Sequence, residues 1–134
     1  MDKTEKIAEY FDHWNELKKS LHLFKVRPPY FKEREVWWAS IGQNLGDEQN
    51  GKNEYFERPV LIVKRFYQNI FLGLPLSTKP KKGNYYYSIV GEKIHGIIIL
   101  SQMKIFDAKR LLRKIEVIDE ATFCDIVKRL KDLI

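Results

Sequence analysis

Apolar residues recur at steps of three and four along the first part of the chain, which is the pattern of an amphipathic helix. Residues 4–23 carry this pattern, with Trp14 on the apolar face and lysines and glutamates on the other. We expect the helix to end within residues 26–30, because Pro28 and Pro29 cannot continue it. The helix is either a cap that docks on the rest of the chain or an arm that packs on a partner.

After residue 33 the pattern changes to short segments rich in β-branched and aromatic residues, which are typical of strands. Strands are predicted over residues 35–41, 59–66, 70–76, 85–90, 94–102 and 113–118. The polar segment 42–57 is a predicted loop, and residues 107–111 form a single helical turn. A final amphipathic helix is predicted over residues 120–133. Asp119 is its predicted N-cap, because a carboxylate there can accept a hydrogen bond from a free backbone N–H of the first turn.

A helix, five or six short strands and a final helix follow one another, and no linker is long enough to divide the chain. This order predicts a mainly β fold with flanking helices, built on a small, strongly curved antiparallel barrel or sandwich. A chain of 134 residues fits one such domain, because two would each bury too small a core. We assign residues 1–31 to an N-terminal helical extension and residues 32–134 to the barrel domain.

The chain has a formal net charge of +6 and a pI of about 9.3. This balance favours a polyanionic partner such as nucleic acid or an acidic protein, although it carries no information about the fold. A merely basic protein without such a partner would have the same composition. The positions of the basic residues therefore say more about a possible partner than their number does.

The single cysteine, Cys124, excludes an intrachain disulfide and fits the reducing cytoplasm. Its place in the apolar pattern of the last helix predicts that it packs in the core. The N-terminus lacks the apolar segment of a signal peptide, and the apolar run 96–100 is far too short to cross a membrane. We therefore expect a cytoplasmic protein that does not contact a membrane.

The histidines, His13, His22 and His95, are scattered along the chain, and one cysteine cannot build a zinc site with them. The sequence has no HExxH, Walker, dinucleotide-binding or GxSxG motif. We therefore expect no metal site and no cofactor. His95 stands at a predicted strand start, where a solvated or packed side chain is an alternative to a catalytic one.

Basic residues gather in two places. The first is the loop with Lys79, Lys81 and Lys82, which precedes three consecutive tyrosines at 85–87. The second cluster comprises Lys104, Lys109, Arg110, Arg113 and Lys114. Cations beside aromatic rings suit single-stranded nucleic acid, because bases stack on rings while ammonium groups meet phosphates. The alternative is a solvated lysine loop whose tyrosines pack by strand alternation.

A polar loop with glycines at both ends, residues 46–51, leads to Arg58 at the start of the apolar strand 59–66. A guanidinium offers a rigid fork of donors that matches a phosphate group and stays charged. Arg58 therefore either meets a phosphate or makes a structural ion pair. Ser77 and Thr78 follow the next strand, where a hydroxyl can donate to a phosphate oxygen or cap a turn.

These motifs resemble the PemK/MazF toxins of type II toxin–antitoxin systems. The matching elements are the Trp-rich strand 35–39, the loop Gly46-Asp47-Glu48-Gln49-Asn50-Gly51, Arg58-Pro59 before the strand 60–63, the turn Pro75-Leu76-Ser77-Thr78, and the late segments 100–107 and 109–111. The resemblance covers about residues 33–134 in order. No single element is specific to the family, but this succession of elements is difficult to obtain by chance.

The resemblance implies an SH3-like barrel that forms a homodimer and cleaves single-stranded RNA, mRNA above all, without a metal ion. The ribose 2′-OH attacks its own phosphate and leaves a 2′,3′-cyclic phosphate and a 5′-OH. It implies that Arg58 and Ser77 are catalytic, serine standing where relatives have threonine. The residues implied to bind RNA are Gln49, Thr78, Lys79, Lys81, Lys82 and Gln102.

The chain departs from the family pattern at two positions. Many members have an aspartate where this chain has Ser101, and a serine is a poor proton acceptor. Either Arg58 and Ser77 carry the reaction, or another group acts as acid or base, with Glu48 and His95 as candidates. The segment 52–57 is also longer than usual, which we expect to alter contacts with RNA or with the antitoxin.

By the same resemblance, an acidic, partly disordered antitoxin would fold onto the basic groove and silence the toxin. Promoter DNA would be bound only through the complex with that antitoxin. The same fold also includes toxins that inhibit gyrase by binding the protein, and the absent aspartate keeps this alternative open. A nucleic-acid-binding barrel without catalysis is a further alternative.

Overall fold

The computed structural model describes residues 2–24 and 27–134. Its elements in chain order are α1 (Lys3–Leu23), β1 (Glu35–Ser40), β2 (Glu57–Tyr67), β3 (Ile70–Ser77), β4 (Tyr86–Val90), β5 (His95–Ile99), the 3₁₀ turn η1 (Leu100–Gln102), β6 (Lys104–Asp107), the 3₁₀ turn η2 (Ala108–Arg110), β7 (Leu111–Val117) and α2 (Glu120–Asp132). All strand pairs are antiparallel. Among these described residues, no helix is long and apolar enough to cross a membrane.

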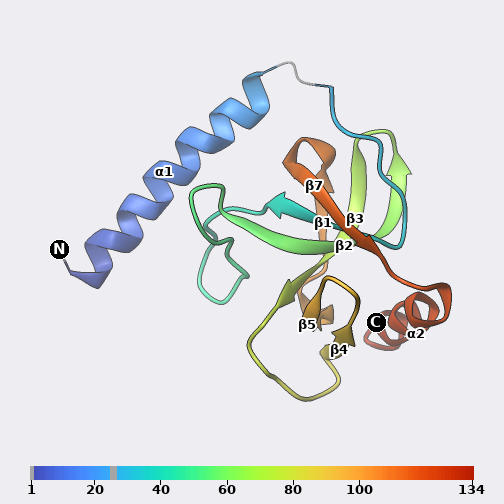
Figure 1. The fold of residues 1–134 in the computed structure, drawn as a ribbon. Coiled ribbons are helices and arrows are strands. Elements are labelled where there is room, and N and C mark those ends of the chain that lie inside the picture. The colour runs from blue at the N-terminus through green and yellow to red at the C-terminus, as the bar shows by residue number, and fades with distance from the viewer. Residues whose placement is uncertain (1, 25–26) are drawn as a thin grey trace.

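The strands form one strongly curved, seven-stranded sheet with the order β4-β5-β3-β2-β1-β7, and β6 pairs with β3 off this path (Figure 1). The curvature arises at β3, which pairs with β2 up to Pro75 and with β5 from Leu76 onward. The predicted mainly β fold with an SH3-like barrel, an N-terminal helix and a C-terminal helix is confirmed.

One side chain ties the two ends of this sheet together. The Glu116 carboxylate on β7 accepts hydrogen bonds from the backbone N–H groups of Glu92 (3.1 Å), Lys93 (3.2 Å) and Ile94 (2.8 Å). These three donors belong to the turn between β4 and β5, at the opposite end of the strand order. Glu116 therefore bridges the open edge of the barrel where no backbone ladder does so.

The core consists of two clusters on opposite faces of the sheet, because successive strand residues point to opposite sides. On β2, Leu61 and Val63 belong to the cluster that α2 covers, while Val60 and Ile62 belong to the other. The first cluster also holds Ile126 and Leu130 of α2. These two residues belong to the apolar stripe predicted for the last helix.

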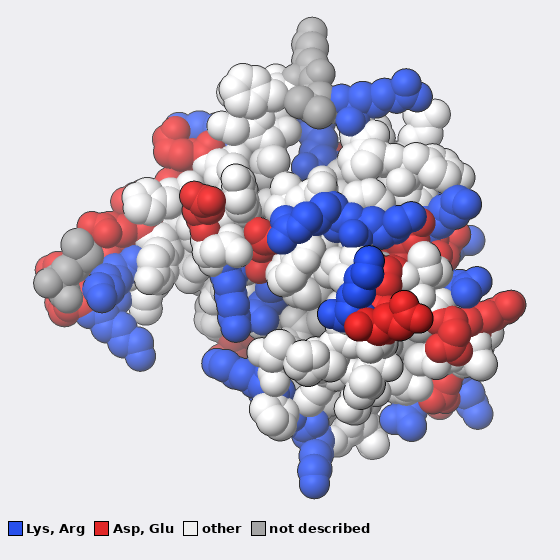
Figure 2. Space-filling view, viewed as in Figure 1, with Lys and Arg blue, Asp and Glu red and all other residues white. Residues whose placement is uncertain are grey.

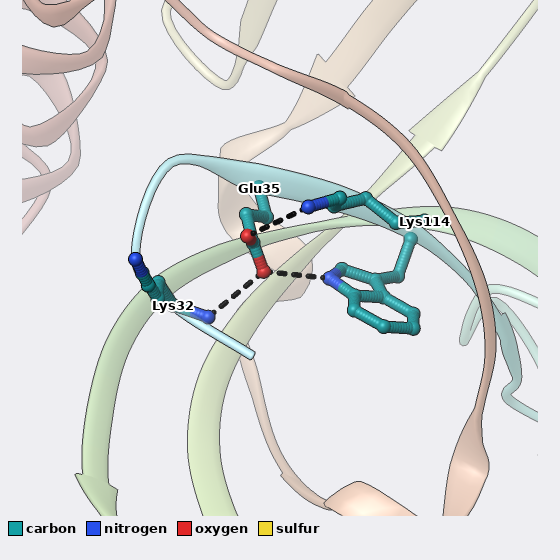
Figure 3. Close-up of polar contacts among 4 residues, drawn as sticks. Lys32, Glu35 and Lys114 are labelled. Atoms are coloured by element: carbon teal, nitrogen blue, oxygen red, sulfur yellow. Dashed lines mark hydrogen bonds and ion pairs between the residues drawn. The ribbon is translucent and has the colours of Figure 1, made fainter. Parts of the chain in front are cut away.

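A buried carboxylate fixes the start of β1. The side chain of Glu35 is 6% exposed, and its Oε1 accepts from the Lys32 backbone N–H at 2.9 Å and from the Trp37 indole N–H at 3.0 Å. The Lys114 ammonium lies 3.4 Å from Oε2 (Figure 3). Both oxygens therefore have donors, which is the usual condition for burying a charge.

Helix α1 lies as an arm along one side of the barrel (Figure 1). Trp14 is its buried residue, whereas Tyr10 is 47% exposed and Phe11 39% exposed on the same apolar face. The helix ends at Leu23, close to the predicted bound, and the predicted break at Val26 lies outside the described residues. Of the two alternatives for this helix, the structure shows docking through Trp14 with much of the apolar face left open.

Two expectations about individual segments were wrong. The predicted strand 94–102 ends at Ile99 and continues as η1, after which β6 forms a separate strand that pairs with β3. An unbroken apolar run could not show this turn, because Leu100 remains buried within it. Cys124 is exposed instead of packed, since it lies beside the stripe formed by Ile126 and Leu130.

The N-cap predicted for the last helix is confirmed. The Asp119 carboxylate accepts from the Thr122 backbone N–H at 3.0 Å and caps α2. This hydrogen bond lowers the pKa of Asp119 below its ordinary value.

Candidate functional site

The loop between β1 and β2 is held in one shape by its own backbone. The Phe56 carbonyl accepts from the N–H groups of Ile41 (2.9 Å) and Gly42 (3.1 Å). A Cβ on Gly51 would lie 1.7 Å from that carbonyl oxygen, so only glycine fits there. Phe56 itself has a φ of +49°, a conformation that bulky residues rarely adopt.

The tip of the loop, residues 44–50, is fixed by amide side chains. The Asn44 amide donates to the carbonyls of Ile41 (3.2 Å) and Gln49 (2.8 Å). From η1, Gln102 accepts from the Gln49 backbone N–H at 3.2 Å and donates to the Asp47 carbonyl at 3.1 Å. Gln102, predicted to bind RNA, therefore positions the loop through both ends of its amide.

This loop holds the side chain of Arg58. The Arg58 Nε donates to the Asn50 carbonyl. With its amide oxygen turned toward the guanidinium, Gln49 accepts from Nη2 at 2.7 Å and from Nε at 2.8 Å. Partial burial lowers the pKa of Arg58 from its ordinary value, although an arginine stays charged at any relevant pH.

Arg58 makes no ion pair with a carboxylate among residues 2–24 and 27–134. Its neighbour Glu57 pairs instead with Arg113, at 2.9 Å. The alternative of a structural ion pair for Arg58 therefore has no support in the described part of the chain. The loop contacts orient the guanidinium through neutral oxygens and leave its positive charge uncompensated.

Arg58 lines a hollow of about 300 Å³ at the ends of β2, β3 and β5, which we call the strand-end hollow. Ser77, Thr78 and His95 line it too, so the structure brings these four predicted site residues together. Its lining residues are Trp38, Lys52, Asn53, Glu57, Arg58, Pro59, Leu76, Ser77, Thr78, Lys93, Ile94 and His95. Three segments that are distant in sequence thus meet where β3 leaves β2.

Ser77 is 9% exposed at the last position of β3. Its Oγ accepts from the Lys79 backbone N–H at 3.2 Å, which leaves the hydroxyl proton free for donation to a ligand. A Cβ on Gly96 would lie 2.5 Å from the Ser77 carbonyl, so the glycine permits β5 to approach closely. His95, next to this glycine, is exposed.

Glu48 lies elsewhere. It lines a second hollow of about 300 Å³, the loop hollow, together with Gln49, Ser101, Gln102 and Lys104. The Leu45 backbone N–H donates to the Glu48 carboxylate at 3.3 Å. Of the two acid or base candidates, His95 therefore shares a hollow with Ser77 and Glu48 does not.

The lysine loop flanks the strand-end hollow. Lys79, Lys81 and Lys82 are all exposed, and Figure 2 shows basic side chains projecting at the lower end of the molecule, where the loop before β4 lies in Figure 1. The Lys81 ammonium lies 5.6 Å from the centroid of the Tyr86 ring. Tyr85 is 56% exposed and available for stacking.

The second basic cluster is largely engaged in structural contacts. Arg110 donates to the carbonyls of Ser40 (3.1 Å) and Ile41 (3.4 Å), and burial lowers its pKa. Arg113 and Lys114 pair with buried glutamates. Arg110, Arg113 and Lys114 therefore have roles within the fold, and the binding of nucleic acid by this cluster stays a prediction.

Sequence reasoning did not assign Trp38 or Glu57 to the site, although both line the strand-end hollow. The strand pairing places Trp38 opposite Pro59 and Ser40 opposite Glu57. Only the register of β1 against β2 shows that these side chains share a face. No group of three or more His, Cys, Asp or Glu side chains that could hold a metal ion occurs in residues 2–24 and 27–134.

A family model described as the PemK-like, MazF-like toxin of type II toxin–antitoxin systems matches residues 32–134. The chain belongs to this family. The match covers more than half of the chain and includes every residue of both hollows. None of the curated protein sequences is significantly similar to this PemK/MazF-family chain.

Solved structures share its fold. MazF from Deinococcus radiodurans superposes with a TM-score of 0.64 at 13% identity, over 78% of this chain and 96% of that one. An endoribonuclease from a mycobacterial species, in complex with its cognate antitoxin, has a TM-score of 0.60 at 13% identity, over 75% and 90%. A MazE–MazF complex from Deinococcus radiodurans has a TM-score of 0.59 at 9% identity, over 78% and 95%. At these identities the likeness concerns the fold.

Proposed function

We propose that this PemK/MazF-family chain is an endoribonuclease toxin that cleaves single-stranded RNA, mRNA above all, at a short sequence and without a metal ion. The observation that carries the proposal is the strand-end hollow, which Arg58 and Ser77 both line. The cation is held by Gln49 and Asn50 and has no carboxylate partner among the described residues. This is a preorganised site for a phosphate group.

In the proposed reaction the ribose 2′-OH attacks the adjacent phosphorus, and the 5′-oxygen of the next nucleotide leaves. The products are a 2′,3′-cyclic phosphate and a 5′-OH. Negative charge builds up on the phosphorane, where Arg58 stabilises it through two-pronged hydrogen bonding. Ser77 donates its free proton to a non-bridging oxygen. The requirement for a 2′-OH selects RNA over DNA.

The reaction also needs a proton acceptor for the 2′-OH and a donor for the leaving oxygen. His95 is the better placed of the two candidates, because it lines the strand-end hollow while Glu48 lines the loop hollow. A histidine serves either role, since it changes charge near neutral pH. Ser101 lies in the loop hollow and does not replace the family aspartate.

The RNA on either side of the cut would follow the basic rim. Lys79, Lys81 and Lys82 meet phosphates on one side, and Thr78 donates a hydroxyl at the edge of the strand-end hollow. Gln49 contributes as the residue that orients Arg58. Gln102 contributes by holding the loop.

The test is cleavage of single-stranded RNA by the purified protein in excess chelator. Arg58→Ala should lower the cleavage rate by about 100- to 1000-fold, the usual loss when one donor to a transition-state oxyanion is removed. Arg129→Ala is the matched control, because Arg129 lies on α2 outside both hollows. Absence of cleavage in the wild type, or equal rates in Arg58→Ala, would refute the proposed activity.

We also propose that the protein is a cytoplasmic homodimer whose cognate antitoxin carries an acidic, partly disordered segment. The charge of +6 supports an acidic partner. Two of the similar structures are described as complexes, one with a cognate antitoxin and one of MazE with MazF. Binding of promoter DNA would then belong to the complex with the antitoxin and not to the toxin alone.

Ser101 favours one alternative, a toxin of this fold that inhibits a protein such as gyrase. The side chain is exposed and offers no carboxylate to the loop hollow. Gyrase inhibition that persists in Arg58→Ala, with RNA left intact, would support this alternative. Tight RNA binding without cleavage and without growth arrest would instead indicate a nucleic-acid-binding barrel.

A further inference from the structure

Helix α1 docks on the barrel through only part of its apolar stripe. Ile7, Tyr10 and Phe11 precede the buried Trp14 by one or two turns, at the spacing that puts them on the same face. All three are exposed, as is every residue in the range 2–13, and this half of the helix projects away from the sheet (Figure 1). The three side chains therefore form an apolar surface that the barrel leaves open, which we call the arm face.

Lysines border the arm face. Lys3, Lys6 and Lys18 each lie four residues, or about one helical turn, from a member of the apolar stripe. All three are exposed, and none makes an ion pair with a carboxylate among residues 2–24 and 27–134. The positive charge of this lysine border is therefore not compensated within the described part of the chain.

The acidic residues of α1 lie on the opposite side of the helix. Glu5, Glu9, Asp12 and Glu16 recur at steps of four and three, so they form a stripe of their own. Because Glu5 precedes Trp14 by nine residues, or about two and a half turns, this stripe points away from the apolar one. Helix α1 thus has an acidic back and an apolar front with a basic border.

The barrel adds positive charge on the apolar side of α1. The Lys109 ammonium on η2 donates to the His22 carbonyl near the end of the helix, at 2.8 Å. Burial, and then the nearby charges of Arg110 and Lys18, lower the pKa of Lys104 on β6. A cation of the helix and cations of the barrel are therefore close enough to repel one another, which favours a negatively charged partner at this side of α1.

This distribution of charge decides which partner suits the arm face. A second copy of the chain would bring its lysine border against the same border, and like charges across a contact repel. A flat bilayer does not fit, because Trp14 turns the stripe toward the barrel and a planar surface would meet the barrel first. A helix with one apolar stripe and carboxylates beside it satisfies both the shape and the charge.

We propose that the arm face docks an acidic amphipathic helix of a partner protein, whose carboxylates pair with the lysine border. The site lies before residues 32–134, the segment that the family model matches, so it belongs to the extension of this chain. The described residues that line the two hollows include none from α1, so the partner leaves both hollows open. Under the proposed function this partner is the cognate antitoxin, and in that respect the inference rests on the proposed function.

The test uses three synthetic helical peptides of about 20 residues. The first has a leucine stripe bordered by glutamates, the second replaces the glutamates with lysines, and the third replaces the leucines with serines. Fluorescence anisotropy with the full chain should show the first peptide binding at least about 10-fold more tightly than either of the others. Equally tight binding of the second or third peptide, or no binding of the first, would overturn the proposal.

Two matched pairs of variants locate the binding. Phe11→Ser should weaken binding of the first peptide by about 10-fold, because apolar contact is lost, whereas Val90→Ser at an exposed position of β4 should leave it unchanged. Lys6→Gln should weaken it about 2- to 5-fold, the usual effect of one exposed ion pair. Lys19→Gln should not, because Lys19 pairs with Glu16 on the acidic back at 3.1 Å. If the two members of each pair bind alike, the peptide does not dock on the arm face.

Two further measurements identify the other occupants. Sedimentation with phosphatidylserine vesicles that is lost in Phe11→Ser, without binding of the acidic peptide, would assign the arm face to a membrane. A wild-type dimer that Phe11→Ser converts into monomers would assign the arm face to a second copy of the chain. Either result overturns the proposal.

Docking and cleavage can fail separately. Phe11→Ser should cleave RNA at the wild-type rate, because Phe11 lines neither hollow. A protein that leaves RNA intact but binds the acidic peptide through the arm face retains the docking site and loses the proposed function. A protein that cleaves RNA but does not bind this peptide retains the proposed function and loses the docking site.

Discussion

At the scale of single residues, the site depends on backbone positions that tolerate few side chains. Gly51 approaches the Phe56 carbonyl so closely that a Cβ would lie 1.7 Å from its oxygen. The same carbonyl accepts from Ile41 and Gly42, and Gly51 donates in turn to the Gly42 carbonyl at 2.8 Å. Both ends of the loop that orients Arg58 are therefore joined through one glycine.

Gly51→Ala should destabilise the fold by about 3 kcal/mol, because the methyl group collides with backbone that cannot move alone. Gly46→Ala is the control. Gly46 has a φ of +54° but nothing within 4 Å of the added Cβ, so only the cost of the left-handed conformation applies. That cost is about 1 kcal/mol. Urea denaturation measures both, and equal losses would contradict the steric argument.

At the scale of elements, α1 is joined to the site although it precedes the segment that the family model matches. The Trp14 ring packs against Phe56 with a centroid distance of 5.8 Å and stacks with the Arg110 guanidinium at 5.7 Å. A Cβ on Gly42 would lie 2.3 Å from this ring. The helix therefore holds the base of the loop between β1 and β2.

Trp14→Ala should cost about 3–5 kcal/mol of stability, the usual loss for a buried tryptophan. Tyr10→Ala on the same helix face should cost much less, since that side chain is 47% exposed. The free energies of unfolding from urea titrations compare the two variants. If both lose the same amount, α1 is not anchored through Trp14.

At the scale of the whole molecule, closure of the barrel rests on Glu116. Its carboxylate is the acceptor for three backbone N–H groups at the far end of the strand order. A Cβ on Gly91 would lie 2.3 Å from Glu116 Oε1, so the turn between β4 and β5 packs directly on the carboxylate. This contact also holds the segment that carries Lys93, Ile94 and His95 against the rest of the barrel.

Glu116→Ala should destabilise the fold by about 3 kcal/mol, because hydrogen bonds to a charged acceptor are lost and their donors are left unpaired. Glu92→Ala should have little effect, since Glu92 contributes its backbone N–H to the contact. Hydrogen exchange should show faster opening of β4 and β5 in Glu116→Ala alone. Unchanged exchange in these strands would show that the barrel closes by other contacts.

The periodicity of the sequence determined both helices, most strands and the Asp119 cap, because these depend on local spacing and on bonds between near neighbours. The ordered motifs also indicated Arg58 and Ser77, which line the same hollow. Glycines and prolines marked where the chain had to turn. The end of β5 escaped this reasoning, because a buried apolar run has the same appearance in a strand and in a 3₁₀ turn.

Only the tertiary structure decided which of the candidate groups meet. Strand register places Glu57 and Trp38 in the hollow with His95, and it places Glu48 in another. It also showed that Gln102 supports the loop and that Arg110, Arg113 and Lys114 make contacts within the fold, whereas their binding of RNA stays a prediction. The physical reason is that these relations join residues far apart in the chain, and local spacing contains no information about them.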